Sequence, residues 1–216
     1  MIALAALLLT QAAPAEQPED ATTTEMQAAP EQPVLPEEAR LNGPYTVISV
    51  KPGVNRIPNF APDGSAAVII SSRVDNGNAW GHRRYEVIIP ARDGEWNLVS
   101  FNDKEVDGII EVPHTGEDAI SVVKFVWGYE DGRRVAFVVQ ASRNPQDGAP
   151  NPTETTITIY SMRENDEVGT TKVYFKPVKE WTAKRHYCNA EMALLDELRI
   201  PLSATYQGVR NAGGCE

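Results

Sequence analysis

The chain has 216 residues, 42% hydrophobic and 7% aromatic, a composition typical of one globular domain with a substantial core. Thirty acidic against twenty basic residues give a net charge of −10, which argues against a nucleic-acid partner because such proteins present a basic surface. The apolar run at residues 1–9 is too short to cross a bilayer, so we expect no membrane span.

Residues 1–15 are predicted to be a signal peptide, complete or truncated at its start. The apolar run is followed by Ala13-Pro14-Ala15, a small-x-small pattern that suits signal peptidase. No basic residue precedes Arg40, although signal peptides normally open with one. Either the true start lies upstream, or this is a short apolar terminus without an export role. We favour export and a periplasmic or secreted protein.

Residues 16–44 are predicted to be an acidic, Pro-rich, disordered linker. Every aromatic residue lies at or beyond Tyr45, and residues 16–40 carry seven acids and one base. Such a segment buries too little apolar surface to offset its ordering entropy. Its charge either attracts basic partners or keeps the domain soluble, and we favour the second interpretation. The folded domain is then expected to cover residues 45–216.

Short β-type runs separated by turn residues fill the first part of this domain. Asp-Gly pairs punctuate the runs because they tolerate positive φ, and Asp131-Gly132 is the clearest hairpin. Many strands without intervening helices predict an all-β fold, an antiparallel β-sandwich. The expected strands are 45–50, 66–74, 84–89, 96–101, 109–112, 120–129, 135–141, 153–160 and 171–177.

A short C-terminal α-helix is expected after Asn189, a suitable N-cap, with apolar residues at helical spacing up to Leu198. Cys188 precedes it and Cys215 lies one residue from the chain end. An even cysteine count in an exported protein favours a disulfide, which would contribute roughly 3 kcal/mol. Two free thiols in a cytosolic protein are the alternative.

We identify no catalytic residues and expect no enzyme and no cofactor. Ser121 and Lys124 match the S-x-x-K motif of serine β-lactamases, but they fall in a predicted strand, where residues three apart face opposite sides. His82, His114 and His186 are scattered and form no zinc motif. A hydrolase whose site is assembled only in space remains a minor alternative.

Two loops are rich in oxygen donors that suit Ca²⁺ or Mg²⁺. They contain Asp63 and the run Asp75-Asn76-Gly77-Asn78. Neither has the EF-hand pattern, and ordinary turns explain both. Asp63 and Asp75 are therefore only weak metal candidates, and with two carboxylates we expect no tight Ca²⁺ binding.

Several short motifs are spread over roughly residues 50–200. They are Gly53-Val54-Asn55-Arg56-Ile57, Asp63-Gly64, Arg73-Val74-Asp75-Asn76-Gly77-Asn78-Ala79 with His82, Ala141-Ser142-Arg143, and Tyr187-Cys188-Asn189-Ala190-Glu191 with Glu197-Leu198. Together they resemble the CarG-type carbapenem intrinsic-resistance proteins.

The resemblance implies a β-sandwich, a homodimer and a non-enzymatic role in carbapenem tolerance, with kinship to periplasmic inhibitors of invertebrate-type lysozyme. It makes Asp75, Asn76, Asn78 and His82 binding candidates. The 58–64 loop lacks the family's carboxylates, which puts its cation site in doubt, and Trp80-Gly81 separates Ala79 from His82. No Ser-Gly dipeptide occurs, although such inhibitors use one.

The sequence therefore favours an exported, non-enzymatic binding or protective protein. Its partner is a small molecule such as a β-lactam or another periplasmic protein. The alternative is a periplasmic protein–protein module, such as a lysozyme-type glycosidase inhibitor.

Overall fold

A computed structural model describes most of the predicted domain. The described residues fall within one compact unit, Glu37–Glu216. The predicted signal peptide and residues 16–40 of the predicted linker lie outside them. The described residues are 41–77, 81–91, 93–101, 107–112, 119–145, 151–165, 171–206, 208–211 and 213–215.

Within these residues the chain forms ten strands and one helix, which confirms the all-β class with a short C-terminal helix. The helix, α1, spans Ala190–Leu198. The strands are β1 (Leu41–Val47), β2 (Gly53–Ile57), β3 (Ala67–Val74), β4 (His82–Pro90), β5 (Trp96–Phe101), β6 (Ile109–Glu111), β7 (Ser121–Glu130), β8 (Arg133–Arg143), β9 (Thr155–Glu164) and β10 (Val173–Thr182).

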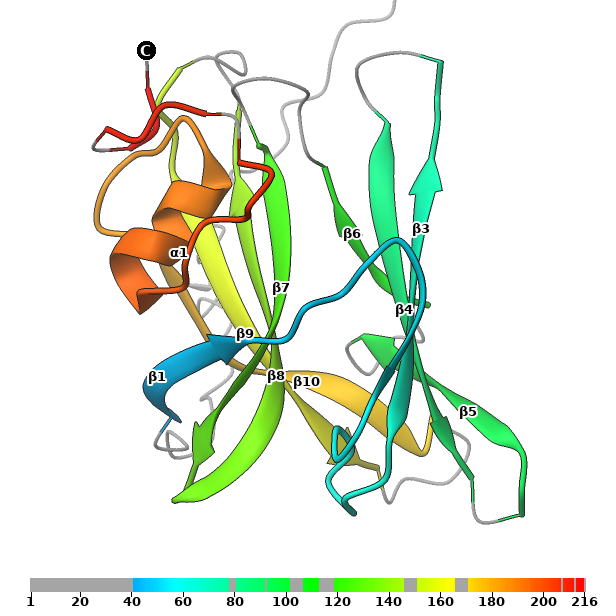
Figure 1. The fold of residues 1–216 in the computed structure, drawn as a ribbon. Helices are drawn as coiled ribbons and strands as arrows, with labels where there is room; N and C mark the ends of the chain where they lie inside the picture. Colours follow the sequence, from blue (N-terminus) through cyan, green and yellow to red (C-terminus); the bar gives the residue numbers. More distant parts are fainter. Residues whose placement is uncertain are drawn as a thin grey trace, which may run out of the picture. The chain divides into compact units, whose positions relative to one another are not determined.

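The predicted sandwich of separate sheets is corrected by the strand pairing. One continuous sheet runs β1-β7-β8-β9-β10-β5-β4-β3-β2, with β6 beside β4. Strand β10 joins the two halves because it pairs antiparallel with β9 and, at Tyr174 and Phe175, parallel with the end of β5. The right-handed twist of strands curls such a sheet. The result is a half-barrel whose halves face each other (Figure 1).

The central strands β7, β8 and β9 are buried on both faces. Their inner faces pack against the β2–β5 half through an aromatic cluster in which Phe101 and Phe175 stack 4.6 Å apart. Their outer faces are covered by α1, which buries Val126, Phe137 and Leu194. Burial on both faces explains why β7 and β8 read as nearly unbroken apolar runs.

Local signals placed α1 and the β7–β8 hairpin correctly. Asn189 caps α1 by accepting the Glu191 N–H at 2.9 Å, and Arg199 ends the helix in the left-handed region at φ +59°. Asp131 and Gly132 both have positive φ and join β7 to β8. Such backbone angles match the twist of the flanking strands.

Two strands differ from the sequence expectation. β2 was not predicted, because its side chains are mostly exposed and it shows no apolar alternation. β1 begins at Leu41, four residues before the expected start of the domain, where Leu41 pairs with Glu130 of β7. The sequence did not predict this strand because Gly43-Pro44 interrupts its pattern, and the pairing with β7 shifts register across those residues.

Candidate functional site

The binding candidates of the sequence analysis lie around the connection between β3 and β4. Asp75 accepts the Gly77 N–H at 2.9 Å, which is the hydrogen bond of an Asx turn. His82 opens β4 and pairs in register with Val74. Asn76 lies in the same turn, whereas Asn78 lies outside the described residues.

The two weak metal candidates are not brought together. Asp63 lies in the β2–β3 connection, where it accepts the Ser65 N–H at 2.9 Å. Asp75 follows the other end of β3, so a whole strand, roughly 20 Å or more, separates the two carboxylates. They cannot bind one ion. Among the residues that the structure describes, no three His, Cys, Asp or Glu side chains gather at metal-binding distance.

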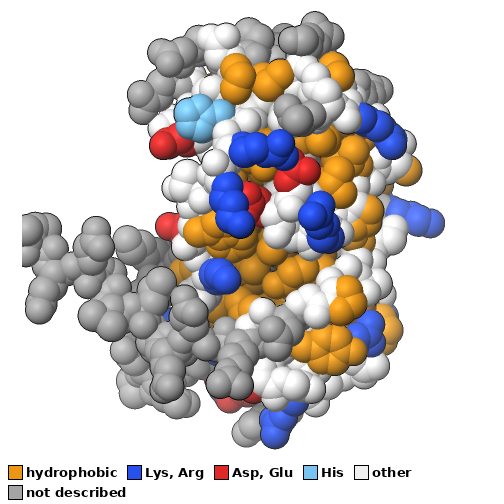
Figure 2. Space-filling view, turned by 90° about the vertical axis from the view of Figure 1, so that its left-hand side faces the viewer, with side chains coloured by type: hydrophobic (Ala, Val, Ile, Leu, Met, Phe, Trp, Pro, Cys, Tyr) orange, Lys and Arg blue, Asp and Glu red, His pale blue; other side chains and the backbone are white. Residues whose placement is uncertain are grey.

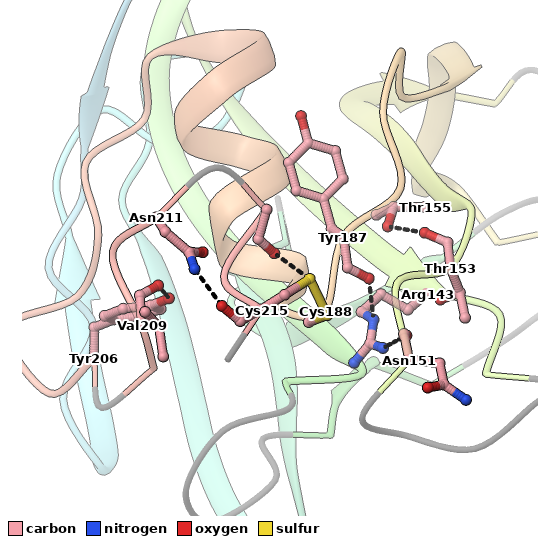
Figure 3. The surroundings of a disulfide bond; sticks show 11 residues. Arg143, Asn151, Thr153, Thr155, Tyr187, Cys188, Tyr206, Val209, Asn211 and Cys215 are labelled. Carbon is pink, nitrogen blue, oxygen red and sulfur yellow. Dashed lines mark hydrogen bonds between the residues drawn. A yellow bond between two sulfur atoms is a disulfide. The ribbon is translucent and has the colours of Figure 1, made fainter.

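Cys188 and Cys215 form the predicted disulfide, with their Cα atoms 5.0 Å apart (Figure 3). Gly213 and Gly214, which directly precede Cys215 and bring it to Cys188, have φ of +99° and +73°. A Cβ on Gly214 would lie 2.9 Å from the Cβ of Asn189, so a side chain there would clash with the helix cap. Disulfides persist mainly in extracytoplasmic proteins.

A buried arginine holds the approach to this disulfide. Arg143, at the end of β8, donates from Nε to the Tyr187 carbonyl at 2.9 Å and from Nη2 to the Asn151 carbonyl at 2.8 Å (Figure 3). Charge-assisted bonds of this kind are stronger than neutral ones. They fix the segment that leads into α1.

The S-x-x-K pair lies on a strand, as the sequence predicted. Both residues belong to β7, where Ser121 donates to the Ile110 carbonyl at 3.4 Å and Lys124 reaches α1. Their side chains therefore point away from each other, unlike the pair one helical turn apart in the β-lactamase motif.

A polar region of the interior lies where β6 meets the start of β7. Val112 N–H donates to the Ser121 carbonyl at 3.0 Å, in an isolated bridge rather than a full ladder. Two residues further along β7, a side chain replaces the backbone partner: the Glu111 carboxylate accepts the Val123 N–H at 3.0 Å. We call Arg83, Tyr85 and Glu111, with this backbone amide, the seam site.

The seam site opens into a cavity of about 380 Å³. Strands β4, β6 and β7 form one wall, and residues 47–50 and 201–205 form the other. The volume is in the range of pockets that hold small molecules.

Glu111 is buried but only loosely paired. It is 8% exposed, and its Oε1 lies 3.6 Å from Nη1 of Arg83, while the Tyr85 hydroxyl donates to Oε2 at 3.4 Å. Burial raises the pKa of Glu111, and the Val123 N–H and the Arg83 charge only partly oppose the rise. Burial and the nearby carboxylate also raise the pKa of Tyr85 to about 12. Arg83 is partly exposed and can meet a ligand.

A second polar cluster lies beside the seam site, and here the pairing is tight. Lys124 Nζ donates to Glu191 Oε1 at 2.6 Å and to Ser203 Oγ at 2.5 Å, and Ser203 donates to the same carboxylate oxygen from its hydroxyl, at 2.6 Å, and its backbone N–H. We call these three residues the lock. It ties β7, α1 and the segment after α1 together. In a Ser–Lys pair the amine must be free to accept the serine proton, and here it is held by the Glu191 carboxylate.

Sequence reasoning missed both clusters. Glu111 belongs to no motif, and Lys124 and Glu191 were noted only in the S-x-x-K match and in the family motif before the helix. Pairing between distant strands and packing of α1 on the sheet bring these residues close. The available signal was a charged residue inside an apolar run, as Lys124 is in β7, because lone charges are rarely buried without a partner.

Comparison with known proteins gives one strong structural likeness. Neither a protein-family model nor a curated protein sequence matches the chain. The crystal structure of CarG matches it with a TM-score of 0.59 and 18% sequence identity, over 70% of this chain and 94% of CarG. The resemblance noted in the sequence is therefore confirmed for the fold. The described residues contain no helix long and apolar enough to cross a membrane.

Proposed function

We propose that this protein is an exported, non-enzymatic binding protein that protects its host by binding a carbapenem-type β-lactam at the seam site. The observation that carries the proposal is the seam cavity, which brings a loosely paired arginine to a partly enclosed pocket. The ligand class is taken from the family that the sequence motifs resemble, and the fold shared with CarG supports that choice.

The seam site suits an anionic small molecule. A carbapenem carries a carboxylate, and an arginine recognises a carboxylate through paired N–H donors. Arg83 is held by Glu111 at 3.6 Å, longer than a charge-assisted hydrogen bond, so a ligand carboxylate can compete for it. The Tyr85 ring and Phe125, which lie 5.4 Å apart and also line the cavity, offer apolar contact.

Binding without turnover is supported by the hydrogen bonds that hold Ser203. Ser203 also lines the cavity, but both of its hydrogen-bonding partners belong to the lock. A general base must be free to take the serine proton, and Lys124 is engaged by Glu191 at 2.6 Å. Export is supported by the Cys188–Cys215 disulfide.

The test combines turnover with equilibrium binding by the full chain. Nitrocefin and a carbapenem are incubated with the protein, and carbapenem binding is followed by calorimetry. We expect saturable binding and no product above the buffer control. Hydrolysis that Ser203→Ala abolishes would replace the proposal with a serine hydrolase. Absence of both binding and turnover would favour the protein–protein alternative.

The proposal includes a homodimer, which the resemblance implies. Analytical ultracentrifugation of the full chain is expected to give twice the 23.7 kDa chain mass. A monomer at all concentrations would remove the dimer from the proposal without affecting the ligand test.

A further inference from the structure

A groove with an apolar floor lies between α1, β1 and β10, away from the seam site. Its volume is about 460 Å³, and Tyr45, Ile159, Trp181 and Leu198 line its floor. On the face that bears α1 and β1, Figure 2 shows Lys and Arg side chains around exposed hydrophobic side chains. Burial raises the pKa of Tyr45, because the floor shields its hydroxyl from water.

A β-bulge in β10 directs two of the side chains that line the groove. Before the bulge, Phe175 packs into the aromatic cluster on the inner face of the sheet. The register shifts after Pro177, and Lys179 then pairs with Ile159, whose side chain lies under α1. Side chains alternate between the two faces of a strand, so the extra residue turns Lys179 and Trp181 to the face that carries α1. The bulge thus brings a cation and an indole ring to the same groove.

The rim of the groove is basic. Three cations, Lys179, Lys184 and Arg199, line it against one acid among the described residues. The cations are exposed, and Lys179 Nζ lies 5.4 Å from the centre of the Trp181 ring. The acid, Glu197, is already engaged, because its carboxylate accepts the Lys184 backbone N–H at 3.1 Å. The C-terminal end of α1 adds only about half a negative charge, so the rim attracts anions.

Floor and rim together define the chemistry of a ligand. A small inorganic anion would leave the apolar floor in contact with water, and a neutral lipid would leave the cations without a partner. A cavity of about 460 Å³ holds a small molecule, whereas a specific protein partner needs roughly 800 Å² of surface on each side. The groove therefore fits a single-chain molecule with an anionic head and an apolar tail.

We propose that this groove binds a small anionic amphiphile, of which a medium-chain fatty acid is the simplest example. The tail lies against Tyr45, Trp181 and Leu198, and the head meets the three cations of the rim. The ligand arrives as a free monomer and not as part of a membrane surface. The site is independent of the seam site, since different residues line the two cavities.

The experiment uses the full chain and the indole N–H resonance of Trp181, assigned with Trp181→Phe. Decanoate is the probe, and its matched ligands are butyrate, which lacks the long tail, and 1-decanol, which lacks the charge. We expect decanoate to shift the Trp181 resonance saturably and to bind at least tenfold more tightly than either, because each lacks one of the two contacts. Trp96, which is 51% exposed on β5, is the control resonance and should not shift.

Variants separate the groove from the seam site and from a general change in the fold. Lys179→Gln/Lys184→Gln should raise Kd for decanoate at least tenfold and leave that for 1-decanol unchanged. Arg83→Gln, at the seam site, and Lys172→Gln, at an exposed position, should change neither value. Equal affinities for decanoate and 1-decanol, or a decanoate Kd that Lys179→Gln/Lys184→Gln leaves unchanged, would overturn the proposal. A Trp181 response to anionic phosphatidylglycerol vesicles but not to decanoate would also overturn it, because the ligand would then be a membrane surface.

Discussion

The seam site and the lock lie side by side, yet they treat a buried carboxylate in opposite ways. Glu191 in the lock meets an ammonium at 2.6 Å and a serine, whereas Glu111 in the seam site has its nearest cation at 3.6 Å. The Glu191 side chain is 9% exposed and that of Glu111 11%, so the difference is one of pairing, not depth.

This difference separates a structural role, that of the lock, from the binding role that we propose for the seam site. Removing charges from water is expensive, and only close pairing with further hydrogen bonds offsets the cost. The lock meets this condition and joins three elements. The seam site does not, and burial raises the pKa of Glu111 because its partners offset the loss of hydration only in part.

Breaking the lock should have the largest effect. Lys124→Met leaves the Glu191 carboxylate buried without its cation, so we expect a loss of about 3–5 kcal/mol in the free energy of unfolding. Urea titration of the full chain measures it. Lys172→Met, at an exposed position, is the control and should change stability by about 0.5 kcal/mol or less. A loss for Lys124→Met no larger than that of the control would show that the lock is not structural.

Reducing the disulfide should cause the second-largest loss in the free energy of unfolding. The bond closes a loop with a sequence separation of 27, which contains Glu191 and Ser203 of the lock but no residue of the seam site. The chain-entropy relation gives roughly 3.5 kcal/mol for a loop of this length. Unfolding with and without reductant measures the difference, and intact mass after alkylation confirms the bond. Two alkylated cysteines in the unreduced protein would refute it.

Glu111→Gln should have a smaller effect that depends on pH. Burial raises the folded-state pKa of Glu111, so between its unfolded and folded pKa values the folded chain holds a proton that the unfolded chain has lost. The stability that the neutral carboxyl contributes is complete below the unfolded pKa of about 4.3 and is lost as pH rises through the folded pKa.

The wild-type chain should therefore lose stability relative to Glu111→Gln as pH rises above this value. Unfolding free energies at several pH values measure the gap between the two. Glu95→Gln, at an exposed position near the start of β5, is the control. A gap that stays constant, or one that favours the wild type at higher pH, would mean that Arg83 pairs Glu111 more tightly than its geometry indicates.

The smallest effect is expected at Asp75, an exposed carboxylate outside both clusters. Asp75→Ala removes one turn hydrogen bond, worth about 0.5–1.5 kcal/mol. Thermal melts in EDTA and in Ca²⁺ at about 1 mM should nearly coincide. A site with so few carboxylates would bind Ca²⁺ only weakly and would add little to the free energy of unfolding. Asp63→Ala, in the matching turn at the other end of β3, should behave alike. A large upward shift in Ca²⁺ that Asp75→Ala abolishes would reveal a metal site.

Features that depend on residues close together in the sequence were predicted, whereas features that depend on contacts between distant segments were not. Asn189, Asp131-Gly132 and the cysteine pair act locally or by count, and the structure confirms their predictions. The single curled sheet depends on β10 pairing with β5, some seventy residues earlier, and no local pattern encodes that contact. The seam site depends on the pairing of β6 with β4 and its bridge to β7, and the lock on the packing of α1 against β7, which are also contacts between distant segments. Their residues were therefore visible in the sequence, but their proximity was not.

We propose that Arg83, which Glu111 holds only at 3.6 Å, binds the carboxylate of a carbapenem. Calorimetry of the wild-type chain, Arg83→Gln and Arg133→Gln tests it directly, with Arg133 as an exposed arginine in the β7–β8 hairpin. Loss of a charge-assisted hydrogen bond should raise Kd about tenfold or more for Arg83→Gln and leave Arg133→Gln unchanged. Equal affinities for all three proteins would contradict the account.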